Sequence, residues 1–185
     1  MIIRESPLPG LLIIEPKVFK DSRGYFFESF NRKNLMDAGV ETQFVQDNQS
    51  LSQYGVLRGL HYQLAPYAQS KLVRVLQGSV WDVAVDIRKN SPTFGQYYGI
   101  ELSAENKIQL FIPQGFAHGF AVTSQTAVFF YKCDCFYNPE AERGIHFNDP
   151  GLAIPWPIPE SEAIISAKDK VLPLFKQATM NFVYR

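Results

Sequence analysis

Short apolar or alternating runs, separated by turn residues, recur along the whole chain. These runs are LLIIEPKVF, YFFESF, FVQDNQSLS, VLRGLHYQ, KLVRVL, VWDVAVDI, YYGIEL, QLFIP, FAHGFAV and AVFFYKC. Many short strands at this spacing predict an antiparallel sandwich or barrel. The run KLVRVL is joined to VWDVAVDI by QGS, whose glycine suits a hairpin turn with a positive φ. We therefore expect an all-β protein in which these two runs pair.

Two segments carry helix signals. Residues 31–39, NRKNLMDAG, end in a glycine suited to a helix C-cap. Residues 166–171, SAKDKV, open with the S-x-x-D capping pattern. We expect two short helices at the periphery of the strands.

The length and composition limit the number of domains. The chain has 185 residues, 46% of them hydrophobic, which is enough for one packed core and too short for two ordinary domains. No repeat, low-complexity tract or linker interrupts it. We expect a single domain over residues 1–185.

The charge balance and the N-terminus exclude several classes of partner. Eighteen basic residues balance eighteen acidic ones, so we expect no nucleic-acid partner and no binding to an anionic membrane. The segment MIIRESPLPG lacks the pattern of a signal peptide, and no apolar run approaches the ~20 residues of a membrane helix. The cysteines, Cys133 and Cys135, are placed poorly for a mutual disulfide. We expect a soluble, cytoplasmic protein with reduced thiols.

Polar residues interrupt the strand VLRGLHYQ, residues 56–63. In a flat strand Arg58 and His61 would point to opposite faces. Gly59 lies between them, and a glycine inside a strand often marks a bulge, which would turn both side chains toward one site. The alternative is a hydrogen-bonded core histidine beside a solvated arginine. The octapeptide alone leaves both interpretations open.

Other strands carry isolated polar residues on apolar faces. His118 alternates with phenylalanines in FAHGFAV, so its imidazole needs a buried partner. Lys71 shares a face with valines in KLVRV, and Tyr131 shares one with Phe129 in AVFFYKC. Each is weak evidence alone, because a lysine at a strand end is usually solvated and a tyrosine among phenylalanines is usually core. Together with His61 they could line one barrel mouth.

The histidines argue against a metal centre. Small β-barrels often hold a metal with histidines and a carboxylate, but the three histidines, His61, His118 and His146, form no H-x-H pair. A scattered site of two histidines and a glutamate remains possible. An Fe(II) oxygenase is therefore kept as a weaker alternative, and we expect no metal.

A set of motifs in this order resembles one enzyme family. The motifs are DSRGYFFESF, FVQDNQSLS, GVLRGLHYQ, KLVRV, DVAVDIRKNSPTFG, LSAENK, IPQGFAHGF and ISAKD. They resemble the dTDP-4-dehydrorhamnose 3,5-epimerases over about residues 10 to 175. The resemblance implies a cupin-type jelly-roll, a homodimer, no metal or organic cofactor, and a dTDP-4-keto-6-deoxyhexose substrate that is epimerised at C3 and C5.

The resemblance also assigns catalytic roles. His61 matches the base, whose ordinary pKa of about 6.5 lets it accept a proton at pH 7. Asp169 matches the acid that orients this histidine and stabilises the imidazolium. Tyr131 matches the proton donor on the opposite sugar face, and Lys71 matches the cation beside the C4 oxygen, where negative charge develops.

Further residues match the family's substrate-binding positions. Arg58 matches a diphosphate contact, which suits the guanidinium fork. By resemblance, Arg23, Phe26 and Glu28 would reach the nucleotide from the neighbouring subunit, although DSRG alone reads as a β-turn. The remaining matches are Gln46, Asp47, Asn48, His118, Glu142 and Lys168. The alternatives are a C3-only epimerase or one with another sugar nucleotide, and a non-catalytic sugar-nucleotide binding module.

Overall fold

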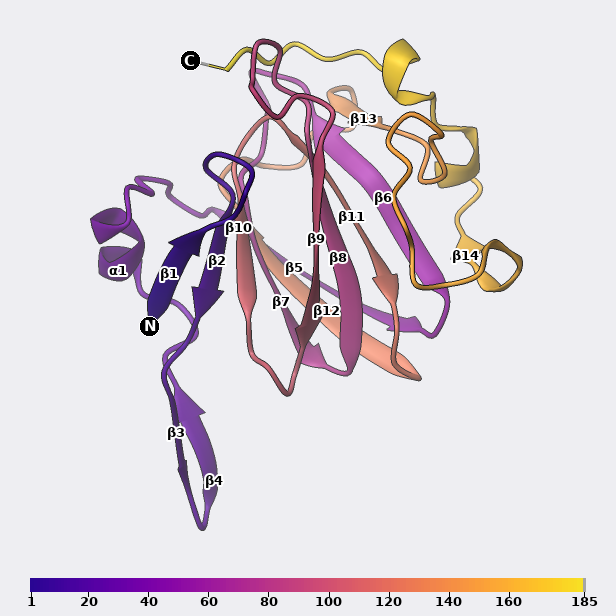
Figure 1. Cartoon of the computed structure of the whole chain (residues 1–185). Helices are drawn as coiled ribbons and strands as arrows, with labels where there is room; N and C mark the ends of the chain where they lie inside the picture. The colour runs from indigo at the N-terminus through magenta and orange to yellow at the C-terminus, as the bar shows by residue number, and fades with distance from the viewer. Residues whose placement is uncertain (185) are drawn as a thin grey trace.

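The computed structural model describes residues 1–184, which form short strands and a few helical turns (Figure 1). The strands are β1 (Ile2–Glu5), β2 (Leu12–Glu15), β3 (Val18–Asp21), β4 (Gly24–Phe27), β5 (Gln46–Gln53), β6 (Val56–Gln63), β7 (Lys71–Gln77), β8 (Ser79–Asp86), β9 (Tyr97–Ser103), β10 (Gln109–Ile112), β11 (Phe116–Val122), β12 (Thr126–Cys133), β13 (Glu142–Gly144) and β14 (Ile164–Ile165). The helical segments are α1 (Arg32–Asp37) and the 3₁₀ turns Glu160–Glu162, Asp169–Val171 and Phe175–Gln177. Every apolar run of the sequence analysis overlaps a strand, whereas β1, β13 and β14 were not predicted.

Two sheets form the body of the fold (Figure 1). The first has the order β1-β2-β10-β7-β12-β5, and the second has the order β13-β6-β11-β8-β9. Neighbours along both paths are antiparallel, while β14 pairs in parallel with β6. The expected all-β jelly-roll is confirmed.

The main core lies where inward-facing side chains of the two sheets meet. Strand β7 contributes Val73 and Val75, and β8 contributes Val80 and Ala84, all of them buried. Alternation along each strand places every second residue in this core. Aromatic side chains of β11 and β12 complete it, with the rings of Phe120 and Phe129 stacked at 4.1 Å between centroids.

The turn between β7 and β8 differs from the expected hairpin. Gly78 has the predicted positive φ of 74°, but β7 pairs with β10 and β12, and β8 pairs with β9 and β11. The pairing prediction is wrong, because this tight turn carries the chain from one sheet to the other. A side chain at Gly78 would collide with the backbone oxygen of Thr126. Glycine is therefore required at this position, because the turn passes close to the backbone of Thr126 where the chain changes sheets.

The two predicted helices differ in outcome. Helix α1 follows the predicted cap pattern, since Asn31 Oδ1 accepts a hydrogen bond from Asn34 N at 3.2 Å and Gly39 follows with a φ of 84°. In the second segment Ser166 Oγ accepts from Asp169 N at 3.1 Å, as the capping pattern predicts. Only a 3₁₀ turn forms there, because Leu172 is extended ahead of Pro173.

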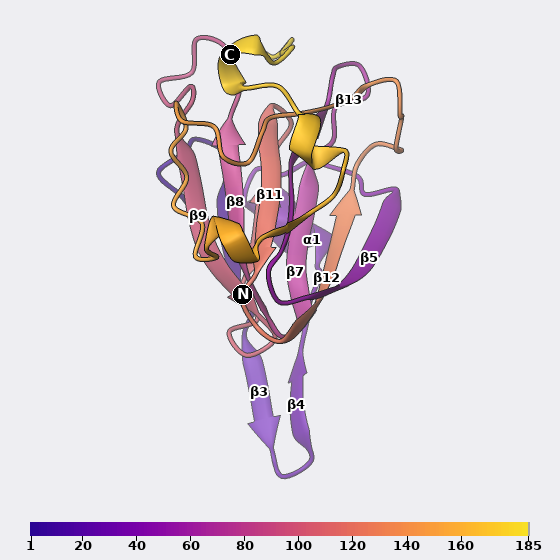
Figure 2. The ribbon, with the colours of Figure 1, turned by 90° about the vertical axis from the view of Figure 1, so that its right-hand side faces the viewer.

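The β3–β4 hairpin projects from the body as an arm (Figures 1 and 2). Its aromatic side chains are largely uncovered, and Phe26 is 70% exposed. Lys107 Nζ of the body lies 4.1 Å from the ring centroid of Tyr25 on β4, which is a favourable cation–π distance. The arm therefore carries apolar surface that no other part of residues 1–184 covers.

No helix within residues 1–184 is both long and apolar enough to cross a membrane.

Candidate active site

A cavity of about 620 Å³ opens between the sheets and the C-terminal segment. Strands β5, β6, β7, β11 and β12 contribute its walls, and the segment around the 3₁₀ turn Asp169–Val171 closes one side. Eight of the predicted site residues line it: Asn48, Arg58, His61, Lys71, His118, Tyr131, Lys168 and Asp169. Residues more than a hundred positions apart in the sequence therefore meet at one place, as the barrel-mouth hypothesis predicts.

A bulge in β6 brings Arg58 and His61 to the same cavity. Their partners on β11 are Phe120 and His118, so three steps along β6 correspond to two steps along β11. Gly59, at the bulge, has a φ of 113°, and a Cβ there would lie 2.6 Å from His118 O and 2.7 Å from Gly119 Cα. Of the two interpretations of VLRGLHYQ, the bulge is the one that the structure contains.

His61 forms a close pair with a buried carboxylate. Its Nε2 lies 2.7 Å from Asp169 Oδ1, and the side chains are 28% and 3% exposed, respectively. The second oxygen of Asp169 accepts a hydrogen bond from Gly59 N at 3.3 Å. Burial alone would raise the pKa of Asp169, but the bonds to His61, Gly59 and Ser166 hold it below the ordinary value. A carboxylate that stays ionised fixes the ring orientation and stabilises the protonated imidazole.

His118 has the buried partner that its apolar strand face required. Its Nε2 lies 2.9 Å from Asp82 Oδ2, and Asp82 is fully buried on β8. Asp82 Oδ1 has no hydrogen-bond partner within residues 1–184. The sequence analysis did not single out Asp82. The signal was present, because in VWDVAVDI an acidic residue alternates with Val80 and Ala84 on the core face.

Lys71 and Tyr131 lie side by side on neighbouring strands. Lys71 Nζ is 5.7 Å from the centroid of the Tyr131 ring. Burial lowers the pKa of Lys71, while the nearby Cys133, Asp82 and Glu142 act in the opposite direction. Burial also raises the pKa of Tyr131 to about 12, so this phenol is protonated at neutral pH. A cation and a proton donor thus share one wall of the cavity.

Polar side chains continue from the cavity to its mouth. Lys168 Nζ lies 2.5 Å from Glu142 Oε2, and the same oxygen accepts a hydrogen bond from Tyr137 Oη at 2.7 Å. Gln46 Nε2 donates to Asn48 Oδ1 at 3.0 Å. Tyr137 N also donates to Gln46 Oε1 at 3.0 Å, so the segments that carry Gln46, Glu142 and Lys168 meet at the mouth.

The structure places four other predicted residues elsewhere. Asp47 pairs with Lys132, with Oδ1 3.0 Å from Nζ, and so lies apart from the cavity-lining residues. Arg23 and Phe26 lie on the projecting arm, where Arg23 pairs with Asp21 at 2.6 Å. Glu28 follows the arm, and its Oε1 accepts a hydrogen bond from Asn34 Nδ2 at 3.4 Å. Within one chain none of these four residues lines the cavity. The β3–β4 arm extends away from the body of the fold (Figure 2).

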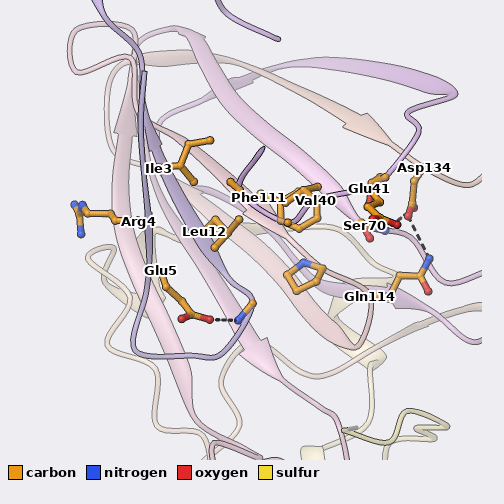
Figure 3. Close-up of a pocket in the computed structure, with 15 residues that line it drawn as sticks. Ile3, Arg4, Glu5, Leu12, Val40, Glu41, Ser70, Phe111, Gln114 and Asp134 are labelled. Atoms are coloured by element: carbon orange, nitrogen blue, oxygen red, sulfur yellow. Dashed lines mark hydrogen bonds between the residues drawn. The ribbon is translucent and has the colours of Figure 1, made fainter. Parts of the chain in front are cut away.

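A second hollow, of about 730 Å³, lies beside the segment that follows α1 (Figure 3). Its lining includes the apolar Ile3, Leu12 and Phe111. Its Asp134 is occupied by hydrogen bonds from Ser70 N and Gln114 Nε2. None of the predicted catalytic residues lines this hollow, and it holds no acid–base pair. The smaller cavity is therefore the candidate active site.

Residues 1–184 contain no cluster of three or more histidine, cysteine or acidic side chains that could hold a metal ion. The chemistry that the cavity residues themselves offer is proton transfer. A histidine paired with a carboxylate, a protonated phenol and a buried ammonium can remove a proton, return one, and stabilise an oxyanion.

Comparisons with known proteins agree with this arrangement. A family model described as dTDP-4-dehydrorhamnose 3,5-epimerase matches residues 5–177. A curated Shigella flexneri protein named dTDP-4-dehydrorhamnose 3,5-epimerase is 56% identical, covering 91% of this chain and 93% of that protein. The crystal structure of an Elizabethkingia anophelis enzyme of the same name has 58% identity and a TM-score of 0.92, covering 95% of this chain and 97% of that one.

A Legionella pneumophila dTDP-6-deoxy-D-glucose-3,5-epimerase, solved in complex with dTDP-4-keto-L-rhamnose, has 53% identity and a TM-score of 0.91. The match covers 95% of this chain and 93% of that one. The residues matched by the family model, 5–177, include every strand that lines the cavity. The chain belongs to the dTDP-4-dehydrorhamnose 3,5-epimerase family.

Proposed function

We propose that this chain is an isomerase that converts dTDP-4-dehydro-6-deoxy-D-glucose to dTDP-4-dehydro-L-rhamnose by inverting C3 and C5. The observation that carries the proposal is the meeting of the His61–Asp169 pair, Lys71 and Tyr131 in one cavity. The named activity of the relatives supports the same substrate and reaction.

The reaction begins with proton removal. The protons at C3 and C5 are acidic because each carbon is next to the C4 ketone. His61 takes one of these protons, and the buried carboxylate of Asp169 stabilises the imidazolium that results. The electron pair of the broken C–H bond moves to the C4 oxygen, giving an enolate. The ammonium of Lys71 stabilises this charge more strongly than it stabilises the neutral ketone.

Inversion requires a proton from the opposite face. Tyr131 lies on β12, across the cavity from His61 on β6, and donates its phenolic proton to the enolate carbon. With a pKa of about 12, the phenol keeps its proton until a strongly basic carbon meets it. His61 then releases its proton to solvent, and the Tyr131 phenolate takes one from solvent. The enzyme is thereby restored without a metal or an organic cofactor.

The nucleotide is held at the cavity mouth. Arg58 faces the diphosphate, and Asn48, His118 and Lys168 line the same cavity. Gln46 and Glu142 bind the substrate from the neighbouring segments, whereas Asp47 is held in its ion pair with Lys132. The whole of residues 1–185 acts as one domain.

The proposed unit is a homodimer with shared active sites. The exposed arm carries Arg23 and Phe26, and Glu28 follows it, so this segment is free to reach the nucleotide in the partner's cavity. The uncovered aromatic surface of the arm supports this exchange, because a partner would bury it. The free thiols of Cys133 and Cys135 fit a reducing, cytoplasmic location.

Proton NMR of the purified protein with dTDP-4-keto-6-deoxyglucose in deuterated water tests the proposal. The expected result is deuterium at both C3 and C5 of a product with both centres inverted, and none with the His61→Ala variant. Deuterium and inversion at C3 alone would identify a C3-only epimerase. Binding without exchange at either carbon would identify a non-catalytic module.

A further inference from the structure

The cavity arginine, Arg58, is anchored by a neutral group. Its Nε and Nη2 both donate to Ser52 Oγ, at 3.3 and 3.1 Å. Ser52 is 6% exposed on β5, and the bulge at Gly59 turns Arg58 from β6 toward it. No carboxylate within residues 1–184 forms an ion pair with Arg58.

A second arginine in this chain shows the usual alternative. Arg88 Nε and Nη2 donate to the two oxygens of Asp86, at 2.9 and 2.8 Å. That buried pair cancels the charge of Arg88 and leaves little attraction for another anion. Ser52 likewise holds two donors of the Arg58 guanidinium with one buried partner. Unlike Asp86, it adds no negative charge.

The difference matters because a guanidinium that is fixed but not neutralised is prepared for an anion. Arg58 has five N–H bonds, and the anchor uses two of them. The others remain for phosphate oxygens. Ordering the side chain before binding also reduces the loss of side-chain entropy that binding would otherwise cost.

We propose that Ser52 is a positioning residue for diphosphate recognition, which fixes the Arg58 guanidinium while leaving its charge available to the substrate. This inference rests on the proposed function, in which Arg58 contacts the diphosphate. Ser52 itself touches no substrate atom in this role and acts through Arg58.

The first test compares two ligands that differ only in the diphosphate. Calorimetric titration of Ser52→Ala should show that dTDP binds roughly 3- to 10-fold more weakly, the size expected for one hydrogen bond. Thymidine affinity should not change. The matched control is Ser79→Ala, which removes a hydroxyl bonded at 2.8 Å to another neutral hydroxyl, that of Thr123, outside the cavity. This control should bind dTDP as the unmodified protein does.

The second test asks whether Ser52 acts through Arg58. In an Arg58→Ala background, Ser52→Ala should change dTDP affinity by less than about twofold, since the group it positions is gone. Ser52→Thr, which keeps the hydroxyl, should restore binding. Ser52→Asp should bind dTDP more weakly than Ser52→Ala, because the new carboxylate neutralises Arg58 and repels the diphosphate.

The outcomes separate the inference from the function on which it rests. If the unmodified protein neither binds dTDP nor exchanges deuterium, the proposed function fails. If it does both, but Ser52→Ala weakens thymidine and dTDP equally, or weakens dTDP equally with and without Arg58, the positioning role is overturned. Tighter dTDP binding by Ser52→Asp than by Ser52→Ala would overturn the charge argument.

Discussion

Replacing Tyr131 with phenylalanine should separate proton exchange from inversion. The Tyr131 ring lies 6.0 Å from that of Phe129 and 5.7 Å from Lys71 Nζ, and phenylalanine keeps both contacts. The hydroxyl makes no hydrogen bond within residues 1–184, so its removal leaves no protein group unpaired and should not change the melting temperature. The substitution therefore removes the proton donor and little else.

The size of the effect follows from the role of the missing group. A positioned general acid contributes about 10²- to 10⁴-fold, which corresponds to about 3 to 5 kcal/mol of transition-state stabilisation. Inversion should fall by this factor. The His61–Asp169 pair is untouched at 2.7 Å, so the enolate still forms, and His61 returns a solvent-derived proton to the face from which it came.

The assay is proton NMR in deuterated water, in which substrate is recovered and its configuration is determined. Tyr131→Phe should yield substrate of unchanged configuration with deuterium at C3 or C5. His61→Ala, the control, should lose both exchange and inversion, because the base is gone. Equal loss of exchange and inversion in Tyr131→Phe would refute the reasoning, since the phenol would then be needed to form the enolate.

Other perturbations test the remaining parts of the site. Mixing inactive Arg23→Ala with inactive His61→Ala should restore activity approaching one competent site per hybrid dimer; proven subunit exchange without recovery would reject the shared site. Incubation with EDTA should leave turnover unchanged, and loss that one divalent metal restores would favour a metal-dependent enzyme. Turnover should fall as pH rises through the lowered pKa of Lys71, because the ammonium is lost. Asp82→Asn should move this fall to lower pH, because it removes a negative charge that favours the ammonium. A pH–rate profile that the substitution leaves unmoved would contradict this coupling. Because the folded pKa of Asp169 lies below its unfolded value of about 3.9, its contribution to stability is present above that pH and is lost as pH falls through the folded pKa. Asp169→Asn should accordingly flatten the acid side of a plot of melting temperature against pH.

Local patterns in the sequence predicted most of the strands but not all of their pairings. Alternation and turn residues located each longer strand, because a two-residue period depends on the strand alone. The β7–β8 hairpin was wrong because the same tight glycine turn serves both a hairpin and a change of sheet. Only the packing of Gly78 against Thr126 of β12, which is far from Gly78 in the sequence, distinguishes the hairpin from the change of sheet. Strands as short as β13 and β14 exist because they pair with β6, and their few residues carry no period.

The site shows the same division between local and distant information. Gly59 within VLRGLHYQ indicated where a bulge could form, since backbone freedom is a property of one residue, but only the register of β6 against β11 distinguishes a bulge from a flat strand. Asp82 and Ser52 were missed because their roles exist only across strands, toward His118 and Arg58 respectively. An acid on the apolar face of VWDVAVDI was nevertheless visible, and a buried carboxylate requires a partner.

The close approach of the paired strands β6 and β11 at Gly59 and Gly119 constrains any attempt to redesign this enzyme. A Cβ on Gly119 would lie 2.6 Å from Arg58 O, and one on Gly59 would lie 2.6 Å from His118 O, so each glycine needs the backbone of the opposite strand at its present distance. Neither position can be rescued by a smaller neighbour, because both clashes involve main-chain atoms. A mutant library aimed at new sugar substrates should therefore hold both glycines fixed and vary the cavity wall, since substitution of a neighbouring side chain removes neither main-chain clash.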